Sequence, residues 1–286
     1  MSNALQHLIQ ILTLEQLDDG LFRGESEDLG FPQVFGGQVV SQALAAAMQV
    51  VDLERDLHSC HAYFLRAGDA AYPIIYETEI LREGNSFSVV SVNAKQHNEI
   101  ICRVMASFQI HETGFEHQAN MPDVSEPETF YSENELIRSL ALMLPAKLRE
   151  KFEAERPFDV RIKHPNDPFN GHKLSPEQFL WVKTNGVAPQ HRRLQQCLLA
   201  YFSDFHCILT MLHPHERGFM QPGLRIATLD HSIWFHRDFD FSQWLLFALD
   251  SPNAFGARGL TCGQVFDQQG NLIASYQQEG LIREVE

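Results

Sequence analysis

Apolar residues recur at helical spacing in three parts of the chain. Near the N-terminus, Leu5, Leu8, Ile9 and Leu12 follow the period of an amphipathic helix. Residues 34–51, "VFGGQVVSQALAAAMQVV", start with two glycines and continue almost without charge, which predicts a loop feeding a mostly buried helix. Residues 188–215 predict a third helix of roughly 20 residues, with a proline suited to its start and another that ends it.

Strand patterns fill most of the remaining chain. Residues 57–69 combine aromatic and branched side chains before a Gly-Asp stop. Residues 73–110 break into three strands at "REGN" and "KQHNE", and residues 243–282 break into three more at "SPNAFG" and "DQQGN". The other strand candidates are 20–30, 157–164, 178–186 and 224–239.

The two halves of the chain repeat the same order of elements. "NEIICRVMASFQI" can be laid against "GNLIASYQQEGLI", with Ile100 over Leu272, at an offset of 172. "HSCHAYFLR" lies over "HSIWFHR" at nearly the same offset. An offset kept over a long stretch indicates an internal duplication. Because a helix that is apolar all round cannot be solvated, the strands of each copy must wrap it.

A polar, acidic and proline-bearing stretch separates the two copies. It contains "HETGFEHQANMPDVSEPETFYSENE" and a short helix candidate near "ELIRSLALML". We therefore expect an N-terminal unit over residues 1–115, a linker with a short helix over 116–155 and a C-terminal unit over 156–286.

Composition and charge narrow the class of protein. The chain has 286 residues, is 44% hydrophobic and has a formal net charge of -15, so we expect no nucleic-acid or anionic-membrane partner. There is no apolar run of about 18 residues and no signal-peptide pattern. Five cysteines without a CxxC pair argue against a disulfide framework or a zinc site and favour the cytoplasm.

Asp204 stands out within the third predicted helix. On a continuous helix it would lie over Ala200, Tyr201, Cys207 and Ile208, which are mostly apolar. An ionised carboxylate there is costly unless it is paired. By spacing alone, a structural carboxylate paired with His206, Ser203 or Arg193 and a functional group are equally good explanations.

Several motifs together resemble one known family. "VFGGQVVSQALAAA", "HSCHAYFLRAGD", "LREGNSFS", "MASFQ", "IATLDHSIWFHRDF" and "IASYQQEGLIR" occur in order along the whole chain and resemble the acyl-CoA thioesterase II family. The resemblance implies an α+β double hotdog, in which two tandem units each wrap a long helix in an antiparallel sheet. It also implies an enzyme that hydrolyses fatty acyl-CoA to a free fatty acid and CoA by direct water attack.

The resemblance further implies three catalytic residues. The family's aspartate, threonine or serine, and glutamine match Asp204 in "YFSDFH", Thr228 in "IATLDHS" and Gln278 in "SYQQEG". They would orient and activate a water molecule without a metal or cofactor. Period-2 alternation places Gln277 or Gln278 inward without deciding between them. Since Gln278 lies over Ala106 at the offset of 172, the duplication favours a single active site.

The resemblance also bears on partners. It implies acyl-CoA as substrate and a homo-oligomer, either a tetramer or a dimer. Relatives usually carry a basic pair after "NSFS", whereas this chain has Val90 and Ser91, so a CoA or subunit contact made by that pair would differ here.

Two other functions remain open at this stage. A hotdog-type enoyl-CoA hydratase or dehydratase would need an acid–base pair, for which Asp230 and His231 are candidates. A non-catalytic acyl-CoA binding protein would be expected to lack the three catalytic residues. His58 and His61 point to opposite faces of a strand, which opposes a shared metal, and Cys207 has no evident base.

Overall fold

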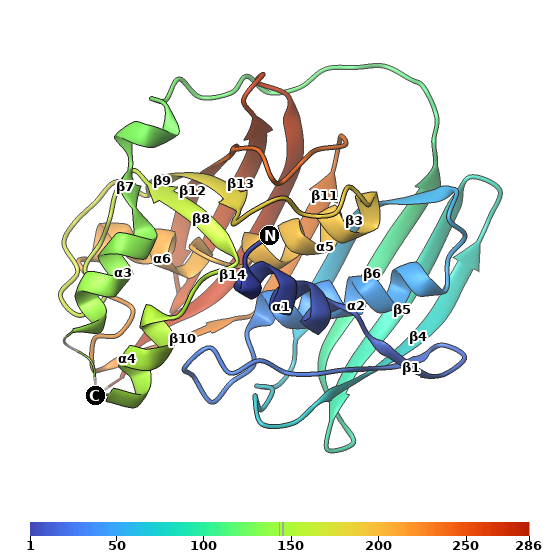
Figure 1. The fold of residues 1–286 in the computed structure, drawn as a ribbon, viewed down its shortest axis with the longest axis horizontal. Coiled ribbons are helices and arrows are strands. Elements are labelled where there is room, and N and C mark those ends of the chain that lie inside the picture. The colour runs from blue at the N-terminus through green and yellow to red at the C-terminus, as the bar shows by residue number, and fades with distance from the viewer. Residues whose placement is uncertain (143, 145, 286) are drawn as a thin grey trace.

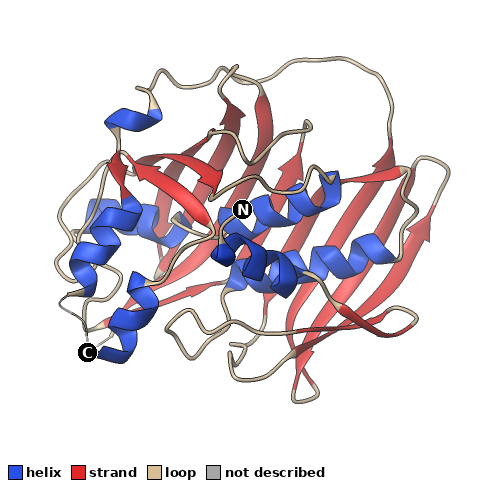
Figure 2. Ribbon diagram, viewed as in Figure 1, coloured by secondary structure: helices blue, strands red, loops and turns tan. Residues whose placement is uncertain are grey.

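Two long helices lie against one face of a continuous antiparallel sheet (Figures 1 and 2). The computed structural model describes residues 1–142, 144 and 146–285. The first half contains α1 (Asn3–Leu12), β1 (Glu15–Asp18), β2 (Leu21–Gly24), α2 (Gly36–Gln49), β3 (Arg55–Phe64), β4 (Ile74–Glu83), β5 (Phe87–Gln96) and β6 (Glu99–Ile110).

The connecting segment carries short elements only. They are a 3-10 turn (Pro127–Thr129), β7 (Tyr131–Ser132), α3 (Glu133–Ala141) and α4 (Ala146–Glu153). The second half contains β8 (Phe158–Ile162), β9 (Glu177–Thr184), α5 (Arg192–Ser203), α6 (Cys207–Leu212), a 3-10 turn (His213–His215), β10 (Leu224–Thr228), β11 (Asp230–Phe235), β12 (Leu245–Phe255), β13 (Arg258–Asp267) and β14 (Leu272–Glu284).

The order of the strands reveals the duplication. Over the part of the chain that the structure describes, 14 strands form one sheet in the order β1-β2-β4-β5-β6-β3-β11-β14-β13-β12-β9-β8-β7, with β10 paired to β14. The run β4-β5-β6-β3 is mirrored by β12-β13-β14-β11, and the two halves join where β3 pairs with β11. Helix α2 packs on the first run and α6 on the second, while α5 packs against α2. The α+β double hotdog predicted from the sequence is confirmed.

Helices α2 and α5 pack closely because small residues line their contact. A Cβ added to Gly37 would lie 2.3 Å from the carbonyl oxygen of Tyr201. The hydroxyl of Ser41, one turn further along α2, donates to the carbonyl oxygen of Cys197 at 2.9 Å. Buried hydroxyls and close backbone contacts of this kind hold the two repeats in one relative position.

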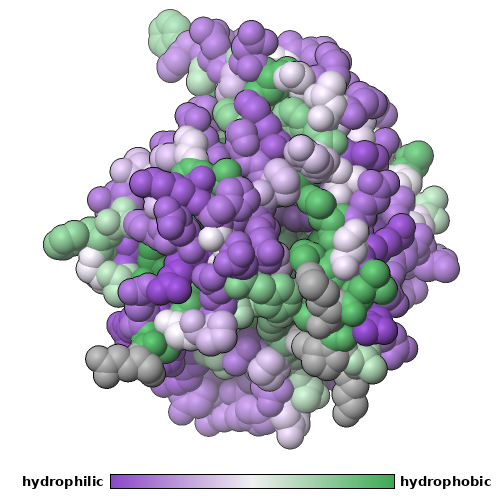
Figure 3. All heavy atoms as spheres, turned by 90° about the vertical axis from the view of Figure 1, so that its left-hand side faces the viewer, coloured by the Kyte–Doolittle hydropathy of each residue, from purple (hydrophilic) through white to green (hydrophobic). Residues whose placement is uncertain are grey.

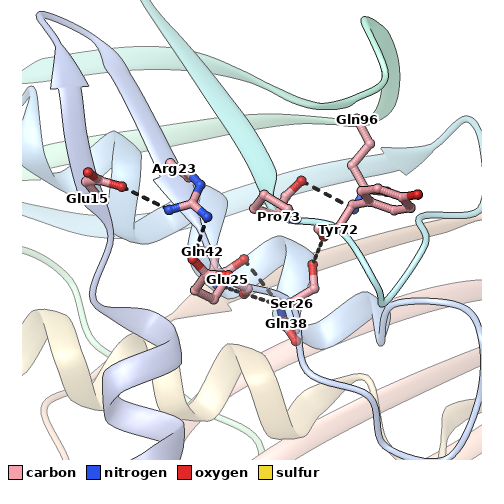
Figure 4. Close-up of polar contacts among 9 residues, drawn as sticks. All are labelled: Glu15, Arg23, Glu25, Ser26, Gln38, Gln42, Tyr72, Pro73 and Gln96. Atoms are coloured by element: carbon pink, nitrogen blue, oxygen red, sulfur yellow. Dashed lines mark hydrogen bonds and ion pairs between the residues drawn. The ribbon is translucent and has the colours of Figure 1, made fainter.

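Polar side chains on α2 tie the N-terminal segments to the helix (Figure 4). The amide of Gln42 donates to the carbonyl oxygens of Ile11 and Glu25, and accepts from the hydroxyl of Tyr76 at 2.7 Å. The amide of Gln38 also donates to Glu25, at 2.9 Å. These buried bonds fix the loop that leads into the N-terminus of α2, which borders the site described below.

Two elements expected to be continuous are each broken in two. The helix expected over 188–215 stops at Ser203 and restarts at Cys207, because His206 takes a left-handed conformation with φ of 66°. The strand expected over 224–239 divides at Leu229 into β10 and β11. Asp204 therefore caps the C-terminus of α5 and does not lie in the middle of a long helix, so the continuous helix expected through it was wrong.

The connecting segment leaves β6, runs past the ends of the strands and then packs beside the second half (Figure 1). Figure 3 views the molecule from the side of α3 and α4, and that face is mainly hydrophilic with some hydrophobic residues beside a hollow. No described helix has the length and apolar character required to span a membrane. The division into three segments expected from the sequence stays a prediction.

Candidate active site

Asp204 lies at the break between α5 and α6 and reaches the other repeat. Its Oδ2 accepts the main-chain N–H of Gly37, the second residue of α2, at 2.7 Å. Helix α2 has no side-chain cap from its own preceding residue, Phe35. The carboxylate therefore takes a capping position at the positive end of α2, where a negative charge is stabilised by about 0.3–1 kcal/mol.

Thr228 contacts the same carboxylate, and Gln278 contacts Thr228. The hydroxyl of Thr228, at the end of β10, lies 3.4 Å from Oδ1 of Asp204. The amide nitrogen of Gln278, on β14, donates to Oγ1 of Thr228 at 3.1 Å. Gln278 is 0% exposed, whereas Gln277 points to the outer face. The structure thus brings the three predicted residues together and decides which glutamine is inward.

His231 and Ser203 extend this cluster, and the sequence interpretation had not placed them in it. Nδ1 of His231 lies 2.8 Å from Oε1 of Gln278, and its Nε2 lies 2.8 Å from Oγ of Ser203. Both residues are buried, with exposures of 1% and 0%. The alternation along β11 turns His231 inward, and that period-2 pattern was the available signal.

Burial dominates the acid–base properties of the cluster. Desolvation raises the pKa of Asp204 above its ordinary value of 3.8, and attraction to His231 together with the bonds from Gly37, Gln278 and Thr228 offsets this only in part. Desolvation lowers the pKa of His231 below 6.5, against the opposing influence of Asp204 and Gln278. Both shifts favour the neutral form of each group.

A contact between Glu133 and His206 holds the helix break against the connecting segment. Oε1 of Glu133, the first residue of α3, lies 3.1 Å from Nε2 of His206. Desolvation raises the pKa of Glu133, but His206 and Arg156 outweigh it, so its pKa is lower than usual. The left-handed residue that ends the helix next to Asp204 is thus fixed by a contact from outside both repeats.

Of the three structural partners considered for Asp204, Ser203 contacts His231 and the carbonyl oxygen of Ala200, and the other two make contacts elsewhere. Arg193 is at the opposite end of α5, where its guanidinium donates to the carbonyl oxygens of Met48 and Asp52. His206 pairs with Glu133, as described above. A cavity of about 500 Å³ lies near Arg193 and is lined mainly by apolar residues such as Met48 and Leu194. Asp204, Thr228 and Gln278 do not line this cavity.

The first repeat has apolar residues where the second has its polar ones. Cys60 on β3 pairs with Ala106 on β6. In the second repeat, Ser232 on β11 pairs with Gln277 on β14. The next residues in this antiparallel register, His231 and Gln278, therefore lie opposite each other. Cys60 and Ala106 are both 0% exposed, so they occupy the same inward layer.

The Val90–Ser91 pair also has a clear place in the fold. Val90 is 0% exposed, on the inner face of β5. Ser91 is cross-strand neighbour to Glu79 and Met105. A charged residue at position 90 would be buried among apolar side chains, so packing accounts for the valine.

Within residues 1–142, 144 and 146–285, no group of three His, Cys, Asp or Glu side chains is arranged to hold a metal ion.

Comparison with known proteins covers the whole chain. Residues 147–281 match the acyl-CoA thioesterase family, and residues 25–109 match the acyl-CoA thioesterase N-terminal domain. Acyl-CoA thioesterase 2 of Haemophilus influenzae is 62% identical over 283 residues, which is 99% of each chain. Human acyl-coenzyme A thioesterase 8 is 37% identical over 281 residues, covering 96% of this chain and 88% of the human one.

Solved structures agree with these matches. The crystal structure of acyl-CoA thioesterase II TesB2 from Mycobacterium marinum has a TM-score of 0.79 and 37% identity, and covers 97% of this chain and 98% of that one. A hot dog fold protein from Alicyclobacillus acidocaldarius has a TM-score of 0.77 at 19% identity, with 98% and 99% covered, which shows the fold alone. From the full-length identity and the two family matches, we conclude that this chain belongs to the acyl-CoA thioesterase family of hydrolases.

Proposed function

We propose that the protein hydrolyses fatty acyl-CoA by direct attack of a water molecule that Asp204, Thr228 and Gln278 hold and activate. The water oxygen bonds to the thioester carbonyl carbon and the carbon–sulfur bond breaks. The water proton passes to Asp204 and then to the departing CoA thiolate, which leaves a free fatty acid and CoA. The observation that carries this proposal is the chain of contacts that runs from Gln278 through Thr228 to the Asp204 carboxylate.

Asp204 is suited to the role of general base. A carboxylate with a raised pKa binds a proton more tightly than an ordinary aspartate, which helps it to take a proton from water. Its Oδ2 is engaged by Gly37, whereas its contact with Thr228 through Oδ1 is long, at 3.4 Å. Since a strong O–H···O bond is nearer 2.8 Å, Oδ1 is the oxygen better placed to accept from a water.

The geometry does not favour an enoyl-CoA hydratase or dehydratase that uses Asp230 and His231 as its acid–base pair. His231 points inward and is engaged by Gln278 and Ser203. Asp230, the next residue, points to the other face of β11, and its carboxylate accepts the main-chain N–H of Glu279 at 2.9 Å. The two cannot act together on one acyl chain. A non-catalytic binding protein would not require a buried carboxylate with these partners.

A thiol-release assay tests the proposal directly. Palmitoyl-CoA and a series of shorter acyl-CoAs are mixed with the protein, and free thiol and enoyl absorbance are followed in parallel. Release of thiol without a change in enoyl absorbance is the expected result. An enoyl change without thiol would instead indicate hydration, and binding without either product would indicate a carrier. The series of acyl lengths also measures the chain-length preference.

The assembly and location of the protein are further parts of this proposal. Tyr63 and Met105 lie on neighbouring strands of the outer sheet face and keep 63% and 45% of their surfaces exposed. Exposed apolar side chains on a sheet face support a homo-oligomer, for which we propose a tetramer with a dimer as the alternative. All five cysteines are free thiols, which supports the cytoplasm. The units 1–115 and 156–286, joined by 116–155, are our proposed domains.

A further inference from the structure

We propose that His231, held by Ser203, is a positioning residue that sets which way the side-chain amide of Gln278 faces in the site. His231 does not contact Asp204 through any hydrogen bond described above, so it would act through Gln278. The inference rests on the proposed function, because it assigns a role within the same cluster. It concerns the direction of the hydrogen bonds and not their mere presence.

The bond between His231 and Gln278 has one workable direction. Oε1 of Gln278 can only accept, so Nδ1 of His231 must carry the hydrogen in their 2.8 Å contact. The amide nitrogen of Gln278 then faces Thr228 and donates to its hydroxyl oxygen. Because that oxygen is accepting, the hydroxyl hydrogen of Thr228 is free to point at Asp204. The chain of donors therefore runs from His231 to the carboxylate.

Ser203 allows the imidazole to keep this role in either protonation state. Its hydroxyl lies 2.8 Å from Nε2 of His231 and 2.9 Å from the carbonyl oxygen of Ala200. It can donate to Nε2 when the imidazole is neutral. It can donate to Ala200 and accept from Nε2–H when the imidazole is charged. Nδ1–H faces Gln278 in both cases.

The titratable groups around His231 fit the neutral form. Asp204 and Asp230 are the acidic groups that act on it, and the ring of Tyr276 lies 6.0 Å away by centroid. Desolvation outweighs the pull of both carboxylates. The neutral form with hydrogen on Nδ1 satisfies every bond named above without turning the amide.

The first repeat shows that the fold itself does not need these polar groups. Ala106, which matches Gln278 at the offset of 172, pairs across the strands with Cys60, and both are fully buried. An apolar pair is thus compatible with this layer of the sheet, whereas a buried imidazole and amide are costly unless hydrogen-bonded. The polar pair in the second repeat is therefore explained by the site and not by the fold.

Paired substitutions separate a positioning role from a packing role. The amide nitrogen of His231→Asn can take the place of Nδ1–H, whereas His231→Gln places its amide near Nε2 and the serine. We expect His231→Gln and His231→Ala to lower kcat for palmitoyl-CoA about 10- to 100-fold with KM changed little, and His231→Asn to recover most of that loss. His236→Asn is the matched control, since His236 also contacts a serine, Ser275, but at an exposed position.

The readouts distinguish failure of this inference from failure of the proposed function. Asp204→Asn and Gln278→Ala are measured alongside, and if both remain active the proposed function itself fails. If both are inactive while Asn, Gln and Ala at position 231 share one kcat, the positioning role is overturned. The acid limb of the pH–rate profile should persist in His231→Asn. Loss of that limb would make His231 the base and overturn the proposal.

A measurement on the unmodified protein covers the case in which variants fail to fold. Nitrogen-15 NMR of the histidine side chains at neutral pH reports which ring nitrogen carries the hydrogen. We expect His231 to be neutral with hydrogen on Nδ1. A neutral ring with hydrogen on Nε2 would force the amide of Gln278 to turn and would contradict the inference.

Discussion

The main-chain N–H of Gly37 donates to the carboxylate of Asp204 at 2.7 Å, and this bond joins the two repeats at the site. Gly37 belongs to the first repeat and Asp204 to the second. A Cβ at Gly36 would lie 2.7 Å from Oδ2 of Asp204, so the carboxylate fits only because the first residue of α2 has no side chain. The site therefore requires both halves of the duplicated chain.

Replacing Asp204 by Asn should remove the proposed general base while keeping the shape of the site. We expect kcat for palmitoyl-CoA to fall by about 10²- to 10⁴-fold, the range associated with general acid–base catalysis. Asp250→Asn, an exposed position on β12, is the control and should keep its activity. Turnover of the Asp204 variant close to that of the unmodified protein would exclude this residue as the base.

The raised pKa of Asp204 predicts a pH dependence of activity. The group must be ionised to accept a proton, so activity should fall as the pH drops through its pKa in the folded protein. Because burial raises that pKa, the acid limb should lie above the 3.8 of an ordinary aspartate. A profile of kcat/KM against pH, with controls for stability, measures the limb. An acid limb at or below 3.8 would contradict the assignment.

The same shift predicts an effect on stability with a definite sign. Between 3.8 and the raised folded pKa, the folded state binds more protons than the unfolded state, so the free energy of unfolding falls as the pH rises. Ionised Asp204 is therefore destabilising at neutral pH. Asp204→Asn should have the higher melting temperature there, with a difference that shrinks as the pH is lowered. A lower melting temperature at neutral pH would refute this account.

Adjacent glutamines offer a matched test of the inward position. Gln278→Ala removes the amide that bridges His231 and Thr228, and we expect kcat to fall about 100-fold. Gln277→Ala changes a neighbouring exposed residue on the same strand and should alter kcat less than about twofold. Steady-state thiol release measures both. Equal losses in the two variants would indicate a general effect on β14.

Gly37 should be intolerant of even one additional carbon. In Gly37→Ala the new Cβ would meet the carbonyl oxygen of Tyr201 at 2.3 Å, so α2 and α5 must move apart. We expect a loss of stability of about 1–3 kcal/mol and a loss of activity, since Asp204 would be displaced. Gly114→Ala, where no atom lies within 4 Å, is the control. Thermal unfolding that is unchanged in Gly37→Ala would show that the helices can adjust.

Much of the fold followed from local pattern. The period of apolar residues located α1, α2 and the two sets of three strands, and the offset of 172 revealed the duplication before any contact was known. These features depend on which face of an element is buried, and the spacing of apolar residues along the chain indicates that face. The motifs also named Asp204, Thr228 and Gln278 as one group through their resemblance to a family.

The tertiary structure decided what spacing leaves open. Spacing predicted a continuous helix through Asp204, but His206, held by Glu133 from the connecting segment, ends it there. Whether Gln277 or Gln278 faces inward depends on the register of β14 against its neighbours, which no local pattern encodes. His231 lies beside Gln278 because β11 pairs with β14. Contacts between residues distant in sequence arise only when both repeats pack together, so the sequence alone could name the chemical groups but not their arrangement.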